Sequence, residues 1–223
     1  MTPNHSNLIP LSIAHATIAA QQQAAAHTIA VQAANFHWAA SRIAPLLTSS
    51  PAVLLQAVVI LGDSTTEGQI ITAVTIPWFT IIELMMHDPN IIYQLGWRKW
   101  EEIIAGAYER AGFDEVTLTP RSGDLGRDVI AVKRGLGTVR IIDQVKAYGP
   151  NHLVTADDVR ALLGVVVGDK ASKGFLTTTS DFAPGLRDDI LIKEFMPARL
   201  ELINGKMLLA RLEELAKEAP HRH

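Results

Sequence analysis

The strongest constraint on the fold is a succession of helix-like and strand-like sequence patterns between residues 98 and 178. It opens with apolar residues at the spacing of an amphipathic helix, namely Trp100, Ile103, Ile104, Ala107 and Ala111. Gly112 follows where a glycine commonly ends a helix. Segments with strand-like composition come next, at residues 116–119, 127–132 and 139–146. The glycine-containing loop between the last two predicts an antiparallel hairpin.

The sequence after this hairpin predicts a return to the same sheet. The tetrapeptide Thr155-Ala156-Asp157-Asp158 is typical of a capping box at the start of a helix. Residues 174–178 are typical of a further strand, and a strand, a helix and a strand usually form a right-handed parallel crossover. Another strand is predicted at 200–203, with a closing helix after Asn204. We therefore expect an α/β fold with a mixed sheet flanked by helices.

The charged residues are unevenly distributed along the chain. Residues 1–90 hold only one of the 20 basic residues and four of the 23 acidic residues. This shift predicts a boundary near residue 90, between a helical N-terminal region of unknown role (1–90) and a C-terminal domain (91–223). The segment between Pro10 and Pro45 is rich in Ala and Gln, which predicts one long helix or two shorter ones.

Two N-terminal stretches are apolar enough to raise the question of a membrane. Residues 43–62 are uncharged but contain Pro45 and Pro51, and residues 69–86 contain Pro77 and Glu83. A spanning helix needs about 20 predominantly apolar residues. These interruptions favour packed helices over membrane association, which stays the alternative for this region.

The absence of cysteine excludes disulfides and thiolate zinc sites and fits a reducing compartment. No lysine or arginine precedes the first apolar stretch, which argues against a secretory signal peptide. Together these features predict a cytoplasmic protein. The formal net charge of −3 gives no bulk electrostatic argument for a nucleic-acid partner.

The predicted hairpin brings candidate catalytic residues together. Asp128 begins its first strand, whereas Gln144 and Lys146 end its second, so an antiparallel pairing places them at one edge. Gln144 and Lys146 are two residues apart and therefore share a strand face. Glu101, at the rim of the apolar face of the preceding helix, offers a second carboxylate.

This set suits hydrolysis of a phosphodiester. Mg²⁺ prefers oxygen ligands, which Asp128, the Gln144 side chain and the Val145 backbone carbonyl can supply. Lys146 can orient the attacking water and offset charge on the phosphate. The residues alone leave an ordinary alternative open, in which Gln144 and Lys146 form a solvated face and Asp128 shapes a turn.

Four segments stand in order between about residues 97 and 215: WEEIIAGAYERAGFDEVTLTPRSGDLGRDVIAVKRG, QVKAYG, DDVRALLGVV and GFLTTTSDFAPG. Together they resemble the catalytic domain of the Mrr-type restriction endonucleases, in the PD-(D/E)xK nuclease superfamily. The family's motifs are matched by Trp100-Glu101, Gly126-Arg127-Asp128, Gln144-Val145-Lys146 and Thr178-Thr179-Ser180.

The resemblance implies that the mixed sheet flanked by helices is restriction-endonuclease-like. It also implies DNA cleavage that depends on Mg²⁺, or on Mn²⁺ in its place, with Asp128, Gln144 and Lys146 catalytic and Glu101 assisting. Gln144 stands where most of the superfamily has a carboxylate, and a neutral amide is a poorer ligand for a hard cation. Glutamine is common in the Mrr branch, however. Trp100 replaces the usual phenylalanine, and the N-terminal third does not resemble the winged-helix domain of some Mrr proteins.

Several other side chains are candidates for DNA contact. The basic ones are Arg98, Lys99, Lys133, Arg134, Lys170 and Lys173, which could equally be solvated charges. His152 follows the Gln-x-Lys motif and is either a DNA contact or a loop histidine. Thr178, Thr179 and Ser180 either bind a phosphate or satisfy the end of a strand.

Three functions follow from these observations. The first is a DNA endonuclease acting in restriction, with any preference for modified DNA left open; a structure-selective nuclease such as a junction resolvase uses the same fold. The second is a non-catalytic DNA-binding or scaffold protein that keeps the fold. The third is a membrane-associated protein bearing a nuclease domain. A double-strand cut needs two active sites, so a nuclease of this kind is expected to form a homodimer.

Overall fold

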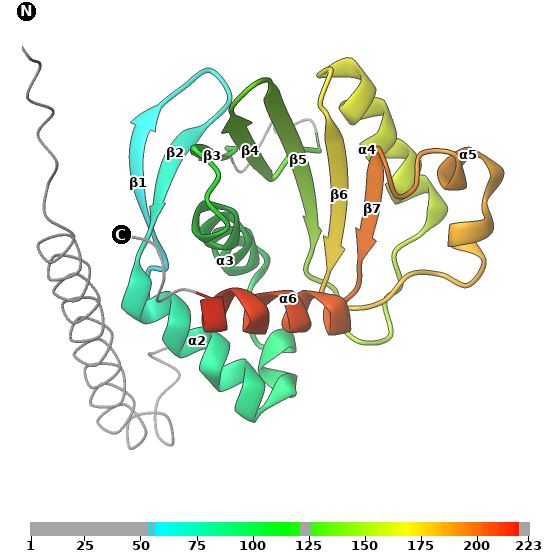
Figure 1. The fold of residues 1–223 in the computed structure, drawn as a ribbon. Coiled ribbons are helices and arrows are strands. Elements are labelled where there is room, and N and C mark those ends of the chain that lie inside the picture. Colours follow the sequence, from blue (N-terminus) through cyan, green and yellow to red (C-terminus); the bar gives the residue numbers. More distant parts are fainter. Residues whose placement is uncertain (1–53, 55, 121–125, 219–223) are drawn as a thin grey trace, which may run out of the picture. The chain divides into compact units, whose positions relative to one another are not determined.

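The computed structural model describes residues 54, 56–120 and 126–218, apart from the side chains of Thr75, Ile76 and Glu218. The described residues belong to one compact unit. The helices and strands of this unit form a single sheet with helices on both of its faces (Figure 1).

The sheet of the described region has seven strands, and their spatial order follows the sequence. They are β1 (Val59–Ser64), β2 (Gln69–Ala73), β3 (Glu115–Leu118), β4 (Val129–Arg134), β5 (Thr138–Lys146), β6 (Lys173–Thr178) and β7 (Leu200–Ile203). Neighbours from β1 to β5 pair antiparallel, whereas β5, β6 and β7 are parallel. The sheet is therefore mixed, with β5 at the junction between its two halves.

Helices cover the two faces of the sheet. The longer ones are α2 (Thr75–His87), α3 (Trp97–Arg110), α4 (Ala156–Gly168) and α6 (Gly205–Glu218). Shorter turns are η2 (Pro89–Tyr93), η3 (Leu186–Asp188) and α5 (Ile190–Lys193). One apolar core includes α2, α3 and α6 and contains Ile141 of β5, whereas a second core includes α4 and contains Ile142. Successive residues of β5 thus point to opposite faces, as the pleat of a strand requires.

The predicted fold class is confirmed by this architecture. The predicted succession of helix, three strands, helix and strand corresponds to α3, β3, β4, β5, α4 and β6. At the start of α4, Thr155 accepts a hydrogen bond from the Asp158 backbone N–H, and the Asp158 carboxylate accepts one from Thr155 N–H, which completes the capping box. Asn204 caps α6 by accepting a hydrogen bond from the Met207 N–H at 3.0 Å.

The helices predicted across residues 43–62 and 69–86 are wrong where the structure describes β1 and β2. A tertiary contact explains the difference, because β2 pairs with β3 through Gln69 and Leu118. At Gly68 a Cβ would lie 2.1 Å from the Leu118 carbonyl oxygen, so only glycine permits this approach. Within residues 69–86, the helical part is α2, which begins at Thr75.

The predicted boundary near residue 90 does not coincide with an edge of the compact unit, which runs from residue 51 to 219. The Trp78 side chain of α2 donates a hydrogen bond to the Ile103 carbonyl of α3 at 3.0 Å. Glu67, in the turn between β1 and β2, makes an ion pair with Arg140 of β5 at 2.5 Å. Residues on both sides of position 90 therefore pack together. The helix predicted between Pro10 and Pro45 lies outside the described residues.

In the part of the chain that the structure describes, no helix has the length and apolar character needed to cross a membrane.

Candidate active site

Asp128 lies immediately before β4, beside the end of β5. Its backbone N–H donates to the Asp143 carbonyl at 3.1 Å, which extends the antiparallel ladder by one step. Its side chain reaches across to β5, where Oδ2 accepts a hydrogen bond from the Val145 N–H at 2.6 Å. The carboxylate is therefore fixed next to the residue that separates Gln144 from Lys146.

Gln144 points toward the α4 side of the sheet, where it meets the loop that leads to Asp128. Gly126 in that loop has a φ of +78°, and a Cβ there would lie 3.3 Å from Gln144 Nε2. Glycine at this position thus allows both the left-handed backbone and the close passage over the amide. Gln144 Oε1 is buried and has no hydrogen-bond partner among the described residues. A buried amide oxygen without a donor is energetically costly, so this atom offers a ligand position.

Lys146 lies on the same face of β5 as Gln144, as the sequence predicts. Its Nζ is 3.5 Å from Oδ1 of Asp158, in the first turn of α4. Partial burial raises the pKa of Asp158, but hydrogen bonds from Thr155 and the charge of Lys146 outweigh this and hold it below its usual value. Asp158 therefore stays ionised and holds the ammonium near the end of β5.

Sequence reasoning identified Asp158 only as a capping residue. That Asp158 lies close to Lys146 was nevertheless predictable from the topology. In a strand-helix-strand crossover, the helix begins near the end of the first strand.

Glu101 is a buried residue of α3 that is connected to the same edge through Arg98. Arg98 Nη1 lies 2.6 Å from Glu101 Oε2 and donates to the Thr119 carbonyl at 3.1 Å. The Thr119 N–H in turn donates to the Asp128 carbonyl at 3.1 Å. This chain of contacts links Glu101 to the backbone that carries Asp128, and it commits Arg98, a candidate phosphate contact, to an ion pair.

The donor atoms at this edge suit a divalent cation, although no group of three or more His, Asp or Glu side chains positioned for a metal occurs in residues 56–120 and 126–218. Hard cations such as Mg²⁺ need only one or two carboxylates, with carbonyl oxygens and waters completing the shell. Asp128 offers the carboxylate, and the buried unpaired oxygen of Gln144 offers the carbonyl.

The three hydroxyls at the end of β6 are used within the chain. Those of Thr178, Thr179 and Ser180 donate to the backbone carbonyls of Lys146, Tyr148 and His152, at 2.8, 2.7 and 2.6 Å. All three residues are buried. Of the two roles that the sequence left open, these contacts correspond to satisfying the strand end, and they anchor the segment that follows Lys146.

His152 lies in that anchored segment, and its ring stacks on Tyr148 with the ring centres 3.8 Å apart. The segment follows directly on β5, so His152 is on the same side of the molecule as the end of that strand. Its predicted contact with DNA stays a prediction.

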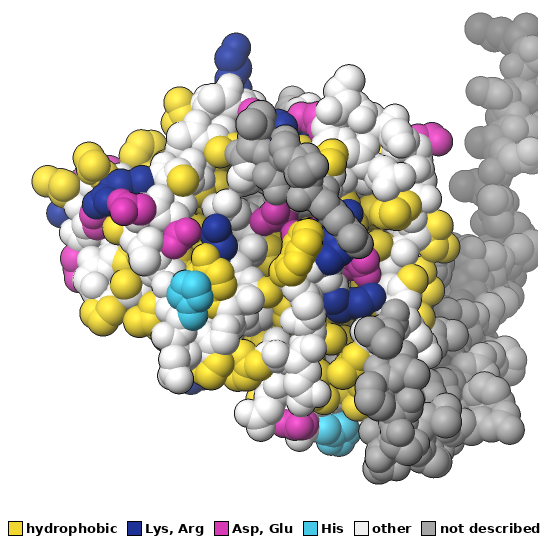
Figure 2. Space-filling model, turned by 180° about the vertical axis from the view of Figure 1, so that it is seen from behind, with side chains coloured by type: hydrophobic (Ala, Val, Ile, Leu, Met, Phe, Trp, Pro, Cys, Tyr) yellow, Lys and Arg dark blue, Asp and Glu magenta, His cyan; other side chains and the backbone are white. Residues whose placement is uncertain are grey.

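Lys133 and Arg134 are not brought to this edge. Arg134 pairs with Thr138 at the turn of the β4–β5 hairpin, whereas Val129 pairs with Asp143 at the other end. Arg134 makes an ion pair with Glu115 at 2.6 Å, and Lys133 lies 3.7 Å from Asp114. On the face of the molecule drawn in Figure 2, basic and acidic side chains are interspersed instead of gathering into one basic patch.

Asp143, which sequence reasoning did not single out, is a second carboxylate of β5. It points to the face opposite Gln144, where Oδ2 accepts hydrogen bonds from Tyr108 at 2.9 Å and Thr177 at 3.1 Å. Burial raises the pKa of Asp143 to about 7, although these two hydrogen bonds lower it. The signal in the sequence was a charged residue at an inward position of an otherwise apolar strand.

The model of the Mrr catalytic-domain family, described as restriction endonuclease, matches residues 92–212, more than half of the chain. The chain therefore belongs to this restriction endonuclease family.

A curated relative is the uncharacterized protein y4cE of Sinorhizobium fredii (strain NBRC 101917 / NGR234), which is 31% identical over 103 residues. The match covers 46% of this chain and 26% of that protein, so the chain spans only about a quarter of the relative's length.

Two solved structures are also similar. One is the MspJI restriction endonuclease in complex with a 27-mer oligonucleotide, with 16% identity and a TM-score of 0.38 over 73% of this chain and 39% of that one. The other is AspBHI, a DNA modification-dependent restriction endonuclease, with 16% identity and a TM-score of 0.37 over 72% of this chain and 43% of that one.

Proposed function

We propose that this protein hydrolyses phosphodiester bonds in double-stranded DNA with the help of a divalent metal ion, as an Mrr-like restriction endonuclease. One observation carries the proposal. At the end of β5, the Asp128 carboxylate lies beside Val145, the neighbouring Gln144 has a buried unpaired oxygen, and Lys146 occupies the same strand face. Family membership supports the same reaction class.

Each residue has a distinct role in this proposal. Asp128, Gln144 and the Val145 carbonyl would hold Mg²⁺ or Mn²⁺. When bound, the ion supplies Lewis-acid activation of the phosphoryl group and a more acidic water. Lys146 directs its ammonium at the scissile phosphate, where it orients the water and offsets the charge that develops. Glu101 assists as a positioning residue, because Arg98 and Thr119 connect it to the strand start that carries Asp128.

The geometry around Lys146 accounts for how its charge is kept in place. Its side chain is 23% exposed, so the ammonium can reach a phosphate, while Asp158 holds it from the other side. The hydroxyls of Thr178 and Thr179 fix the backbone just after it. A positioned donor is worth far more in catalysis than a freely moving one, because no reorganisation is needed during the reaction.

The proposed substrate is duplex DNA cut in both strands, which requires two active sites and hence two copies of the chain. A preference for modified DNA belongs to the same proposal and is tested with methylated and unmethylated substrate.

The test is nicking and linearisation of supercoiled plasmid, methylated and unmethylated, with Mg²⁺, Mn²⁺ or EDTA. Wild type is compared with Asp128→Ala and with the control Asp157→Ala, which removes an exposed carboxylate from the first turn of α4. We expect cutting that depends on metal, is lost in Asp128→Ala and is retained in the control.

DNA binding without cutting of any substrate by the wild type would contradict the proposal and favour the non-catalytic alternative. Cutting restricted to a branched junction added to the substrate panel would instead identify a structure-selective nuclease.

A further inference from the structure

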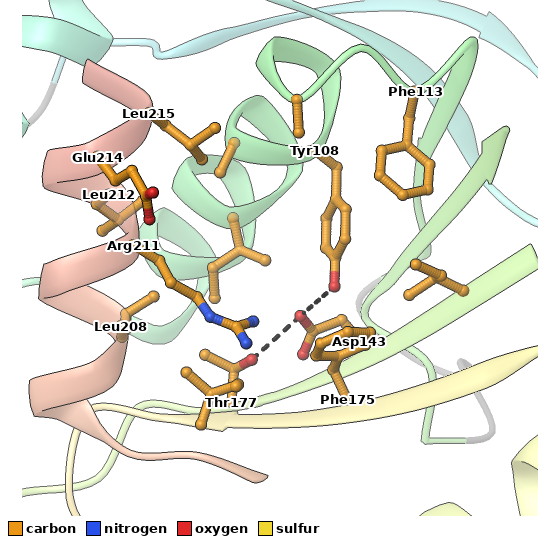
Figure 3. Close-up of a pocket in the computed structure, with 15 residues that line it drawn as sticks. Tyr108, Phe113, Asp143, Phe175, Thr177, Leu208, Arg211, Leu212, Glu214 and Leu215 are labelled. Atoms are coloured by element: carbon orange, nitrogen blue, oxygen red, sulfur yellow. Dashed lines mark hydrogen bonds between the residues drawn. The ribbon is translucent and has the colours of Figure 1, made fainter. Parts of the chain in front are cut away.

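A cavity lies on the face of the sheet opposite Gln144 and Lys146. It has a volume of about 370 Å³ and lies between α3, α6 and the sheet (Figure 3). Its wall is mainly apolar and includes Ile104, Phe113, Ile141, Phe175, Leu208 and Leu212. A cavity of this size and lining is typical of small-molecule sites.

Three charged side chains line this cavity, those of Asp143, Arg211 and Glu214. Asp143 is only 2% exposed, and Figure 3 shows Tyr108 and Thr177 converging on one of its oxygens. The other oxygen, Oδ1, is buried and has no hydrogen-bond partner among the described residues. Because two donors fix the orientation of the carboxylate, Oδ1 is an oriented acceptor just behind the wall of an apolar cavity, and a ligand reaches it when the covering side chains move aside.

Arg211 contributes positive charge to the same cavity. Its guanidinium extends from α6 toward Asp143 (Figure 3), makes an ion pair with Glu201 and lies over the ring of Phe175 at 5.6 Å. A guanidinium has five N–H donors, so the contact with Glu201 leaves others available. Its N–H groups favour a ligand that presents an acceptor. The Glu214 carboxylate, which lines the same cavity, offsets the positive charge, so an uncharged ligand is favoured.

We propose that this cavity binds a small, mainly apolar molecule carrying a neutral amide. The amide N–H donates to Asp143 Oδ1, its carbonyl accepts from Arg211, and its apolar body packs against Phe113, Phe175 and Leu212. The site is separate from the proposed nuclease site, because Asp143 and Gln144 are successive residues of β5 and face opposite sides.

The test uses small lactams on the full-length protein in the absence of DNA and metal. Oxindole and caprolactam are each paired with their N-methyl counterpart, which keeps the shape and removes the donor. Binding is measured by calorimetry and by ligand-observed NMR. We expect the N–H lactams to bind and the N-methyl forms to bind roughly tenfold more weakly or worse, because Oδ1 is then buried against a methyl group.

Asp143→Asn provides the matching change in the protein. Its amide oxygen can still accept from Tyr108 and Thr177, whereas its NH₂ group faces the ligand N–H, so affinity for the N–H lactams should fall by a similar factor. Asp157→Asn, at an exposed position, should leave the affinity unchanged.

Failure of both N–H lactams to bind the wild type would overturn the proposal, as would equal affinity for the N-methyl forms. The comparison within each ligand pair uses wild-type protein and is therefore independent of how the variants fold. Neither readout involves cleavage, so it stands apart from the outcome of the plasmid assay.

Discussion

The polar side chains on the two faces of β5 differ in their exposure to solvent. Toward α4, Gln144 and Lys146 stand at the strand end, and the Lys146 side chain remains 23% exposed and paired with Asp158. Toward α3 and α6, Asp143 is 2% exposed and faces an apolar cavity. One strand thus presents a charge that solvent can reach on one side, and a secluded carboxylate on the other.

The difference shows that the pKa of a carboxyl depends less on its position along the chain than on what covers the face that it lies on. Asp143 lies one residue from Gln144, yet burial raises its pKa to about 7. Asp158, at the more open face, has its pKa held below the usual value by Thr155 and Lys146, against the effect of partial burial. Chemistry that needs ionised groups is therefore expected on the α4 side of the sheet. On the side of α3 and α6, we expect binding of a ligand in a mainly apolar cavity.

The largest expected effect is the loss of cleavage in Lys146→Ala. We expect the cleavage rate to fall by roughly 100-fold or more, because a positioned charge at the phosphate is removed. The melting temperature should change by only a few degrees, since the partly exposed ion pair with Asp158 contributes little to stability. Cleavage assays and thermal unfolding check this. Lys133→Ala, at the other end of the hairpin, is the matched control, and equal losses in the two variants would contradict the assignment.

A second prediction concerns the pH dependence of stability on the Asp143 side. The pKa of this carboxyl is about 7 in the folded protein, against an ordinary value of 3.8. Between these values the folded state binds more protons than the unfolded one, so Asp143 makes the wild type less stable as pH rises from about 4 to about 7. The loss amounts to at most ~1.4 kcal/mol for each pH unit.

Asp143→Asn removes this proton linkage. Urea unfolding at pH 5 and pH 8 should show that the variant gains stability relative to the wild type at the higher pH. If the free energies of unfolding of the two proteins differed by the same amount at pH 5 and pH 8, Asp143 would not be a buried, titrating carboxyl.

A smaller effect is expected at Gly126, which shapes the loop over Gln144. Alanine there must adopt a φ of +78°, which costs about 1–2 kcal/mol, and its Cβ crowds the Gln144 amide at 3.3 Å. Gly126→Ala should therefore lower the free energy of unfolding and reduce cleavage. Gly135→Ala, where nothing lies within 4 Å of an added Cβ, serves as the control in urea unfolding. Similar stability of the two variants would argue against a constrained loop.

The smallest effect is expected for Gln144→Glu. A carboxylate is a better ligand for a hard cation than an amide, so the affinity for Mn²⁺ should rise several-fold. Without metal, the new charge lies next to Asp128 and should lower the melting temperature. Calorimetric titration with Mn²⁺ checks this, with the exposed Gln94→Glu as control. An unchanged affinity would remove Gln144 from the proposed ligand set.

Local patterns in the sequence were sufficient to predict the strands and the longer helices from α3 onward, but not η3 and α5. The spacing of Trp100, Ile103 and Ile104 predicted a helix, and the capping box at Thr155 predicted the start of another. The meeting of Asp128 with the end of β5 followed from hairpin geometry alone, and the structure confirms it. These features depend on residues close in sequence, which is why they could be predicted.

Other features depend on contacts between distant segments. β2 is a strand because it pairs with β3, whose residues lie more than 40 positions away. Asp143 is a cavity residue because α6, at the other end of the domain, helps to enclose it. No local pattern around Gln69 carries that information, and the apolar composition there suggests a helix. The charge of Asp143 within an apolar strand marks the residue as unusual, but it does not show the cavity.

The most direct test of the account compares the two carboxylates beside Gln144. Single-turnover cleavage of plasmid DNA with Mg²⁺ is measured for the wild type, Asp128→Ala and Asp143→Asn. The account predicts that Asp128→Ala loses cleavage by roughly 100-fold or more, whereas Asp143→Asn stays within a few-fold of the wild type. Retained cleavage in Asp128→Ala together with its loss in Asp143→Asn would place the hydrolytic site on the other face of β5 and contradict the account.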